Sequence, residues 1–129
     1  MSDSSIYVRR ADCRRRDTPI TLVVIEADQL TPDERTAFTL LSSRVDTALL
    51  PNPKQDEFAA LCRQRGCAFD QATVIATTQH GLPLLLEAAV ALTLRGAGYE
   101  NEAAADMVFK PRSSGGLAAA IEYVCRLVA

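Results

Sequence analysis

The chain has 129 residues, of which 48% are apolar and 23% are charged, and its formal net charge at pH 7 is −2. This length and balance fit one globular domain with a single core. No apolar run is long enough to span a membrane and no signal-peptide pattern is present, so we expect a cytoplasmic protein. The net charge does not favour binding to nucleic acid.

Arginines crowd the start of the chain: Arg9, Arg10, Arg14, Arg15 and Arg16. We interpret residues 1–18 as a solvated N-terminal arm, in which residues 6–8 are a candidate edge strand, and residues 19–129 as the structured domain. A patch for RNA or for an acidic partner is the alternative interpretation of the arm. The four cysteines have no metal-ligand spacing, so they predict no zinc site.

The strongest strand pattern is Ile20–Ile25, where β-branched residues dominate. Glu26 and Asp28 follow it directly. Polar residues at the carboxyl end of a strand usually face the ligand crevice of an open α/β sheet. Both are therefore candidate site residues, and the alternative is that they merely end a buried strand.

A capping-box pattern with a proline in its first turn follows at residues 31–34. It predicts a helix over residues 32–43, with three apolar side chains turned inward: Phe38, Leu40 and Leu41. The alternative makes residues 38–41 a strand that ends at Ser42. The capping box favours the helix.

Strand and helix patterns alternate from there on, as in a parallel sheet with right-handed crossovers. The predicted elements are a strand at 46–50, a helix from Lys54 to Gly66, a buried strand at 73–76, a helix at 82–89, a strand at 90–97, a turn with Gly96, Gly98 and Asn101, a short helix at 102–105, a strand at 107–109 and a final helix at 117–128. The predicted fold class is α/β, a Rossmann-like three-layer α/β/α sandwich with a mostly parallel sheet.

Several stretches carry a resemblance to a known family. Lys54 opens a helix, and Ile75-Ala76-Thr77-Thr78-Gln79-His80-Gly81-Leu82-Pro83 aligns with the motif Ile-Gly-Asp-Asp-x-x-Asp-Leu-Pro. Ala104-Ala105-Asp106-Met107-Val108 and Ser114-Gly115-Gly116-Leu117-Ala118 resemble Ala-Ala-Asp-Tyr-Val and Gly-Gly-x-Gly-Ala. These motifs are similar to those of the haloacid dehalogenase-like (HAD) phosphatases, and most of all to the capless branch that dephosphorylates 3-deoxy-manno-octulosonate 8-phosphate.

The resemblance implies a truncated HAD-like core at residues 19–129, without a cap domain and without one strand–helix unit of the family. It gives Glu26 the position of the nucleophile, Asp28 that of the general acid/base and Lys54 that of the charge-neutralising lysine. Glu26 is one methylene longer than the family's aspartate, and in-line attack tolerates such a shift poorly. His80 is a weaker catalytic candidate, and three hydroxyl residues are ligand-binding candidates: Thr77, Thr78 and Ser42.

In the family this loop holds Mg²⁺ through aspartates, and here those positions are Thr77, Thr78 and Gly81. None of them supplies a carboxylate to a hard cation that prefers six oxygen ligands. We therefore predict no metal site. Mg²⁺ is expected as a cofactor only if the chain is an enzyme.

Two classes of function follow from this sequence. The first is a HAD-like protein without phosphatase activity that acts by binding, as a structural or regulatory subunit or as a binder of a small phosphorylated ligand. The second is an active phosphatase or hydrolase on a phosphorylated sugar or nucleotide, using Glu26, Asp28 and Lys54. A degenerate receiver-like domain ranks third, because Lys110-Pro111 resembles the end of response-regulator receivers. The capless branch forms tetramers, so a homo-oligomer is expected.

Overall fold

The computed structural model describes residues 6–8, 19–51 and 55–128. Lys54 and most of the arginine-rich arm lie outside the described residues, and so do residues 52 and 53. The boundary between arm and domain therefore stays a prediction.

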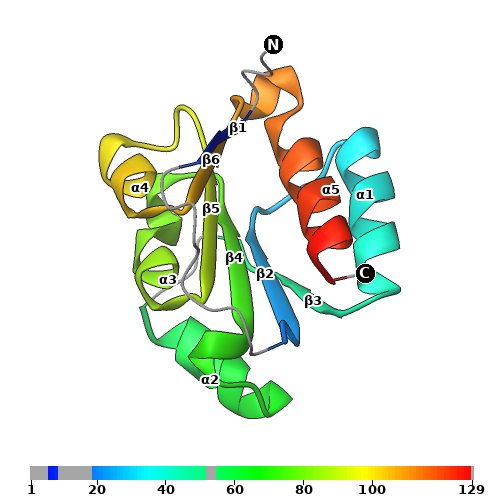
Figure 1. Ribbon diagram of the computed structural model, residues 1–129, viewed down its shortest axis with the longest axis vertical. Coiled ribbons are helices and arrows are strands. Elements are labelled where there is room, and N and C mark those ends of the chain that lie inside the picture. The colour runs from blue at the N-terminus through cyan, green and yellow to red at the C-terminus, as the bar shows by residue number, and fades with distance from the viewer. Residues whose placement is uncertain (1–5, 9–18, 52–54, 129) are drawn as a thin grey trace.

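One six-stranded sheet forms the middle of the described molecule, in the strand order β1-β6-β5-β4-β2-β3 (Figure 1). Five strands run parallel, and the edge strand β1 runs antiparallel to β6. The predicted mostly parallel sheet and the candidate edge strand are therefore confirmed. The strands are β1 Ile6–Val8, β2 Leu22–Glu26, β3 Asp46–Leu49, β4 Ala72–Ala76, β5 Val90–Leu94 and β6 Met107–Phe109.

Helices cover both faces of this sheet and complete the three predicted layers (Figure 1). The helices α1 and α5 lie together on one face, and α2, α3 and α4 lie on the other. Their bounds are α1 Pro32–Ser42, α2 Gln55–Arg65, α3 Leu82–Glu87, α4 Tyr99–Ala104 and α5 Gly116–Val128, with 3₁₀ turns η1 Phe69–Gln71, η2 Gln79–Gly81 and η3 Arg112–Ser114. No helix among the described residues has the length and apolar character needed to cross a membrane.

Alternate side chains of β2 enter two separate cores. Val23 and Ile25 pack with the α1 and α5 layer, whereas Leu22 and Val24 pack with α2 and α3. All four are fully buried, as expected for a parallel strand covered on both faces. The strand therefore holds its carboxyl end, where Glu26 lies, in a fixed place.

The direction of strand addition reverses at β2. The chain passes from β2 to β3 on one side and then to β4 on the other side of β2. In open α/β sheets, ligands bind outside the carboxyl ends of the strands at such a reversal. The loops that follow β2 and β4 are therefore where a site is expected.

The capping box of α1 forms as predicted. The Glu34 backbone N–H donates to the Thr31 hydroxyl at 3.3 Å, and the Thr31 N–H donates to the Glu34 carboxylate at 2.9 Å. The helix continues to Ser42, so the alternative strand at residues 38–41 is wrong. Leu41 is buried as predicted, but Leu40 is 47% exposed, because one residue along a helix turns a side chain by about 100°.

The end of α2 was also predicted from its sequence. Gly66 adopts φ +66°, a conformation in which a side chain is strained. Its N–H donates to the Arg63 carbonyl at 3.2 Å, and the Cys67 N–H donates to the Cys62 carbonyl at 2.9 Å. These two bonds are the pattern of a Schellman cap, so the stop at Gly66 is confirmed.

One ion pair joins the loop after β6 to the first turn of α1. The Arg112 Nε and Nη2 groups donate to the two Glu34 carboxylate oxygens at 2.9 and 2.8 Å, and Nη2 also donates to the Gln29 carbonyl. The Glu34 side chain is only 4% exposed. These hydrogen bonds from Arg112 hold the pKa of the Glu34 carboxyl below its usual range.

We expect Glu34→Gln to destabilise the protein at pH 7 by about 2 kcal/mol, because the charged pair is lost and Arg112 stays half-buried. A carboxyl group with a lowered folded pKa stabilises the fold above its unfolded pKa, and the effect is lost as the pH falls through the folded pKa. Urea unfolding should therefore separate the two proteins at pH 7 and bring their midpoints together near the acid end. Asp33→Asn, an exposed neighbour, is the control and should change little. Equal midpoints for wild type and Glu34→Gln at pH 7 would contradict this account.

Candidate functional site

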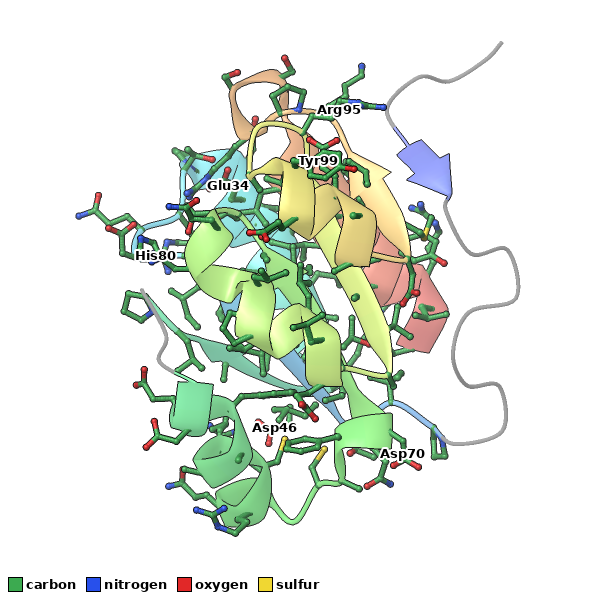
Figure 2. The ribbon with its side chains drawn as sticks, turned by 90° about the vertical axis from the view of Figure 1, so that its left-hand side faces the viewer. Glu34, Asp46, Asp70, His80, Arg95 and Tyr99 are labelled. Atoms are coloured by element: carbon green, nitrogen blue, oxygen red, sulfur yellow. The ribbon has the colours of Figure 1, made fainter. Side chains whose placement is uncertain are left out.

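The candidate site is a hollow at the carboxyl ends of β2 and β4, with a volume of about 250 Å³. The end of β2 and the loops after β2, β3, β4 and β6 supply its lining residues: Glu26, Ala27, Asp28, Pro51, Thr77, Thr78, His80 and Arg112. Figure 2 shows His80 and Glu34 toward one end of the molecule, with Asp46 and Asp70 toward the opposite end. The hollow thus lies at the strand reversal, where the topology predicts it.

The Glu26 carboxylate is turned toward the loop that follows β4. Its Oε1 accepts hydrogen bonds from the backbone N–H groups of Thr77 and Thr78, both at 2.8 Å. Its Oε2 pairs with the Thr78 hydroxyl at 2.9 Å. The Thr77 hydroxyl donates to the Glu26 main-chain carbonyl at 2.6 Å and lies 3.3 Å from Oε1.

These contacts follow from the register of the sheet. Glu26 is paired with Ala76, the last residue of β4, so the loop at residues 77–78 begins directly beside it. The Glu26 residue is only 3% exposed. A buried carboxylate needs hydrogen-bond donors, and two successive backbone N–H groups of the loop supply them.

Asp28 and His80 lie nearer the opening of the hollow, and both are exposed. The backbone N–H of His80 donates to the Thr78 hydroxyl at 3.2 Å, which fixes the start of η2. The structure thus brings five predicted site residues together: Glu26, Asp28, Thr77, Thr78 and His80.

Two predicted site residues are not brought to the hollow by the described structure. Ser42 lies in the last turn of α1, and this helix returns the chain toward the start of β3, at the opposite edge of the sheet. The strand that would have carried Ser42 into the site is a helix, so its placement gives no support to a ligand-binding role. Lys54 lies outside the described residues, and its role stays a prediction.

Arg112 and Asn101 were missed as site residues. Arg112 lines the hollow, and the hydrogen-bonded Glu34 carboxylate, with Asp28 and Glu26 further away, raises the pKa of its guanidinium. Asn101 is fully buried in α4, where a turn was predicted, and its amide donates to the Thr78 carbonyl at 2.8 Å. The carboxyl-edge rule that selected Glu26 would also have pointed to the loop after β6. No sequence signal predicts the Asn101 contact.

The residues at the hollow do not fit Mg²⁺. The loop after β4 offers hydroxyl groups and no carboxylate, and the buried carboxylate of Glu26 already accepts hydrogen bonds from that loop. Within the described ranges, no three His, Cys, Asp or Glu side chains form a group that could hold a metal ion. Magnesium prefers an octahedron of hard oxygen ligands with one or two carboxylates among them.

Comparisons with known proteins place the fold. No protein-family model matches the sequence, and no curated protein matches it. Among solved structures, the 3-deoxy-D-manno-octulosonate 8-phosphate phosphatase from Moraxella catarrhalis is similar over 84% of this chain and 85% of its own, with a TM-score of 0.63 and 13% identity. The same phosphatase from Yersinia pestis gives a TM-score of 0.64 and 14% identity over 84% and 80% of the two chains.

A haloacid dehalogenase-like hydrolase from Bacteroides thetaiotaomicron is similar over 55% of this chain, with a TM-score of 0.51 and 21% identity. The similar part spans only 27% of that hydrolase. At such identities the likeness is one of fold. The predicted α/β fold is confirmed: the chain shares the fold of these haloacid dehalogenase-like structures.

Proposed function

We propose that this chain is a HAD-fold protein that does not catalyse Mg²⁺-dependent phosphoryl transfer and that acts by binding, as a regulatory or structural subunit or as a binder of a small phosphorylated ligand. The observation that carries the proposal is the state of Glu26. Its carboxylate is buried and hydrogen-bonded to the loop after β4, through Thr77 and Thr78.

A nucleophilic carboxylate must present an oxygen to the phosphorus atom at about 3–3.5 Å and in line with the leaving group. Each Glu26 oxygen is instead engaged by the protein, and Oε1 accepts two N–H groups at 2.8 Å. Attack through Oε1 would break these bonds and leave two loop N–H groups without their acceptor, which costs about 1–3 kcal/mol for each group. Attack through Oε2 would require this oxygen to leave the Thr78 hydroxyl.

The charge around the hollow also disfavours phosphoryl transfer. Glu26 and Asp28 both bring negative charge to it, and catalysis of this reaction depends on positive groups that stabilise the transferred phosphoryl. Among the described lining residues the permanent cation is Arg112, and it is already paired with Glu34. The described lining residues therefore supply little positive charge to stabilise such a transition state.

The same residues are compatible with modest binding of a small ligand. Arg112 is held by Glu34 through Nε and Nη2, and among the described residues its Nη1 has no hydrogen-bond partner. A guanidinium fixed in this way can donate to a phosphate oxygen with little loss of side-chain freedom. The volume of about 250 Å³ suits a compact polar molecule.

An active hydrolase is the second candidate. The observation that favours it is Asp28, which lies two residues after Glu26, lines the hollow and is exposed to solvent, as a general acid/base would need to be. In that case Glu26 would have to leave the loop when substrate binds.

Turnover tests these candidates directly. We expect no phosphate release above background from a panel of sugar phosphates and nucleotides with Mg²⁺ present, because Glu26 is engaged and the residues do not fit the metal. The measurement is a phosphate-release assay of wild type and Glu26→Gln beside each other. Release by wild type that disappears in Glu26→Gln would mean that the enzyme interpretation is right.

Stability tests the role of Glu26 independently of any substrate. Glu26→Ala leaves the Thr77 and Thr78 N–H groups without their acceptor, so we expect a loss of about 2–3 kcal/mol in the free energy of unfolding. Glu26→Gln keeps one carbonyl oxygen for these donors and should lose less. The measurement is urea unfolding, with Asp28→Asn as the matched control that should stay near wild type.

Active-site residues are often held at a cost to stability, so removing one tends to stabilise the protein. A Glu26→Ala variant that is more stable than wild type would therefore contradict the anchoring role and favour the enzyme.

A further inference from the structure

We propose that Glu26 is an internal ligand of the loop after β4, and that Ala76 and Gly81 are packed so that residue 81 cannot carry a side chain. The loop is thereby closed to a divalent cation from within, and ligand recognition is left to the groups at the opening: Asp28, His80 and Arg112. This inference rests on the proposed function, because it explains how the site can exist without a metal.

The first step is the path of the loop. After β4 the chain turns through Thr77 and Thr78 into η2, and the Gly81 N–H donates to the Thr78 carbonyl at 3.1 Å. This turn folds Gly81 back over the end of its own strand. Gly81 has φ −85° and ψ −2°, an ordinary backbone conformation for any residue. The backbone torsion angles at position 81 therefore do not require a glycine there.

The second step is the space around Gly81. A Cβ atom added there would lie 2.6 Å from the Ala76 Cβ, 3.3 Å from the Ala76 Cα and 3.1 Å from Glu26 Oε1. Atoms of the β4 strand cannot withdraw, because Ala76 is fully buried and paired with β2 and β5. Glu26 Oε1 cannot withdraw without losing its two N–H donors. Contact, and not torsion, therefore keeps residue 81 without a side chain.

The third step compares this packing with the motif that the loop resembles. That motif, Ile-Gly-Asp-Asp-x-x-Asp-Leu-Pro, has its glycine at the position of Ala76 and an aspartate at the position of Gly81. Here the side chain is present at 76 and absent at 81. Compared with the motif, position 76 has gained a Cβ atom and position 81 has lost one. The Glu26 carboxylate occupies part of the space beside both positions. A carboxylate at 81 cannot return by one substitution.

The consequence concerns what the hollow can recognise. Thr77 and Thr78 direct their backbone N–H groups to Glu26 and not to solvent, so these donors are not available to a ligand. A ligand is left with the side chains of Asp28, His80 and Arg112. The loop therefore lines the site without offering these backbone N–H groups to a ligand.

A double-mutant cycle tests the packing. Gly81→Ala should lower the urea midpoint by about 1 M, because the new methyl meets Ala76. Ala76→Gly should lower it less. In Ala76→Gly/Gly81→Ala the methyl group is moved from one position to the other, and the midpoint should recover well above the sum of the two single losses.

The matched control pairs Gly81→Ala with Ala91→Gly, which removes an equally buried methyl from the neighbouring strand β5. Losses in this control pair should add, since a methyl at 81 does not have Ala91 among its closest contacts. If the Ala76 and Gly81 losses also add, or if Gly81→Ala unfolds at the wild-type midpoint, the proposal is overturned. Absence of turnover would then still support the proposed function, so the two failures are distinguishable.

Metal binding provides the second readout. Mn²⁺ titrated into the full wild-type chain, followed by electron paramagnetic resonance, should show no saturable site. Saturable binding that is lost in Glu26→Gln and kept in Glu122→Gln, a change on the exposed surface of α5, would mean that Glu26 is free to bind a cation and would overturn the proposal.

Discussion

The carboxylate of Glu26 joins the ends of two neighbouring parallel strands, and the edge of the sheet that a ligand would approach is built around it. Glu26 is only 3% exposed, and a carboxylate withdrawn from water in this way needs hydrogen-bond donors from the protein. The loop after β4 therefore depends on the side chain at 26, and that side chain depends on the loop. Buried polar groups satisfied in this reciprocal way tend to fix one arrangement. The chemistry open to the site is limited by this arrangement more than by the fold.

Strand order locates the site but leaves its chemistry open. Numbered along the chain, the five parallel strands have the order 2-1-3-4-5, which flavodoxin-like folds and receivers also have. Topology alone therefore does not separate a shortened HAD-like core from a receiver-like one, and the similarity to solved HAD-like structures is a similarity of fold. Both groups use the carboxyl ends of the strands, so function has to be argued from the side chains there.

Much of the fold could be predicted from the sequence because its signals are local. The capping box at Thr31, the glycine stop at Gly66 and the β-branched run of β2 each act over a few residues, and each was confirmed. Leu40 was placed inward wrongly, since the pattern of apolar residues did not fix the face to better than one position. In a short amphipathic helix, few apolar residues are available to define which face is buried.

The sequence did not predict the contacts between side chains and segments that lie far apart along the chain. Glu26 and Asp28 were selected from their position after a strand, but nothing local indicates that Glu26 turns to the backbone of Thr77 and Thr78. The bond between Arg112 and Glu34 joins residues 78 positions apart. Asn101 was expected in a turn, and its buried contact with the Thr78 carbonyl depends on how α4 packs. Such contacts exist only once the layers are assembled.

The antiparallel edge strand has a consequence for how the molecule keeps apart from its copies. β6 is a short, fully buried apolar strand, and β1 occupies the hydrogen-bonding edge that β6 would otherwise present. An uncovered edge of this kind is a template for another chain. β1 thus takes the edge position from β6, and a variant that lacks residues 6–8 is expected to expose the edge of β6 and to be less soluble.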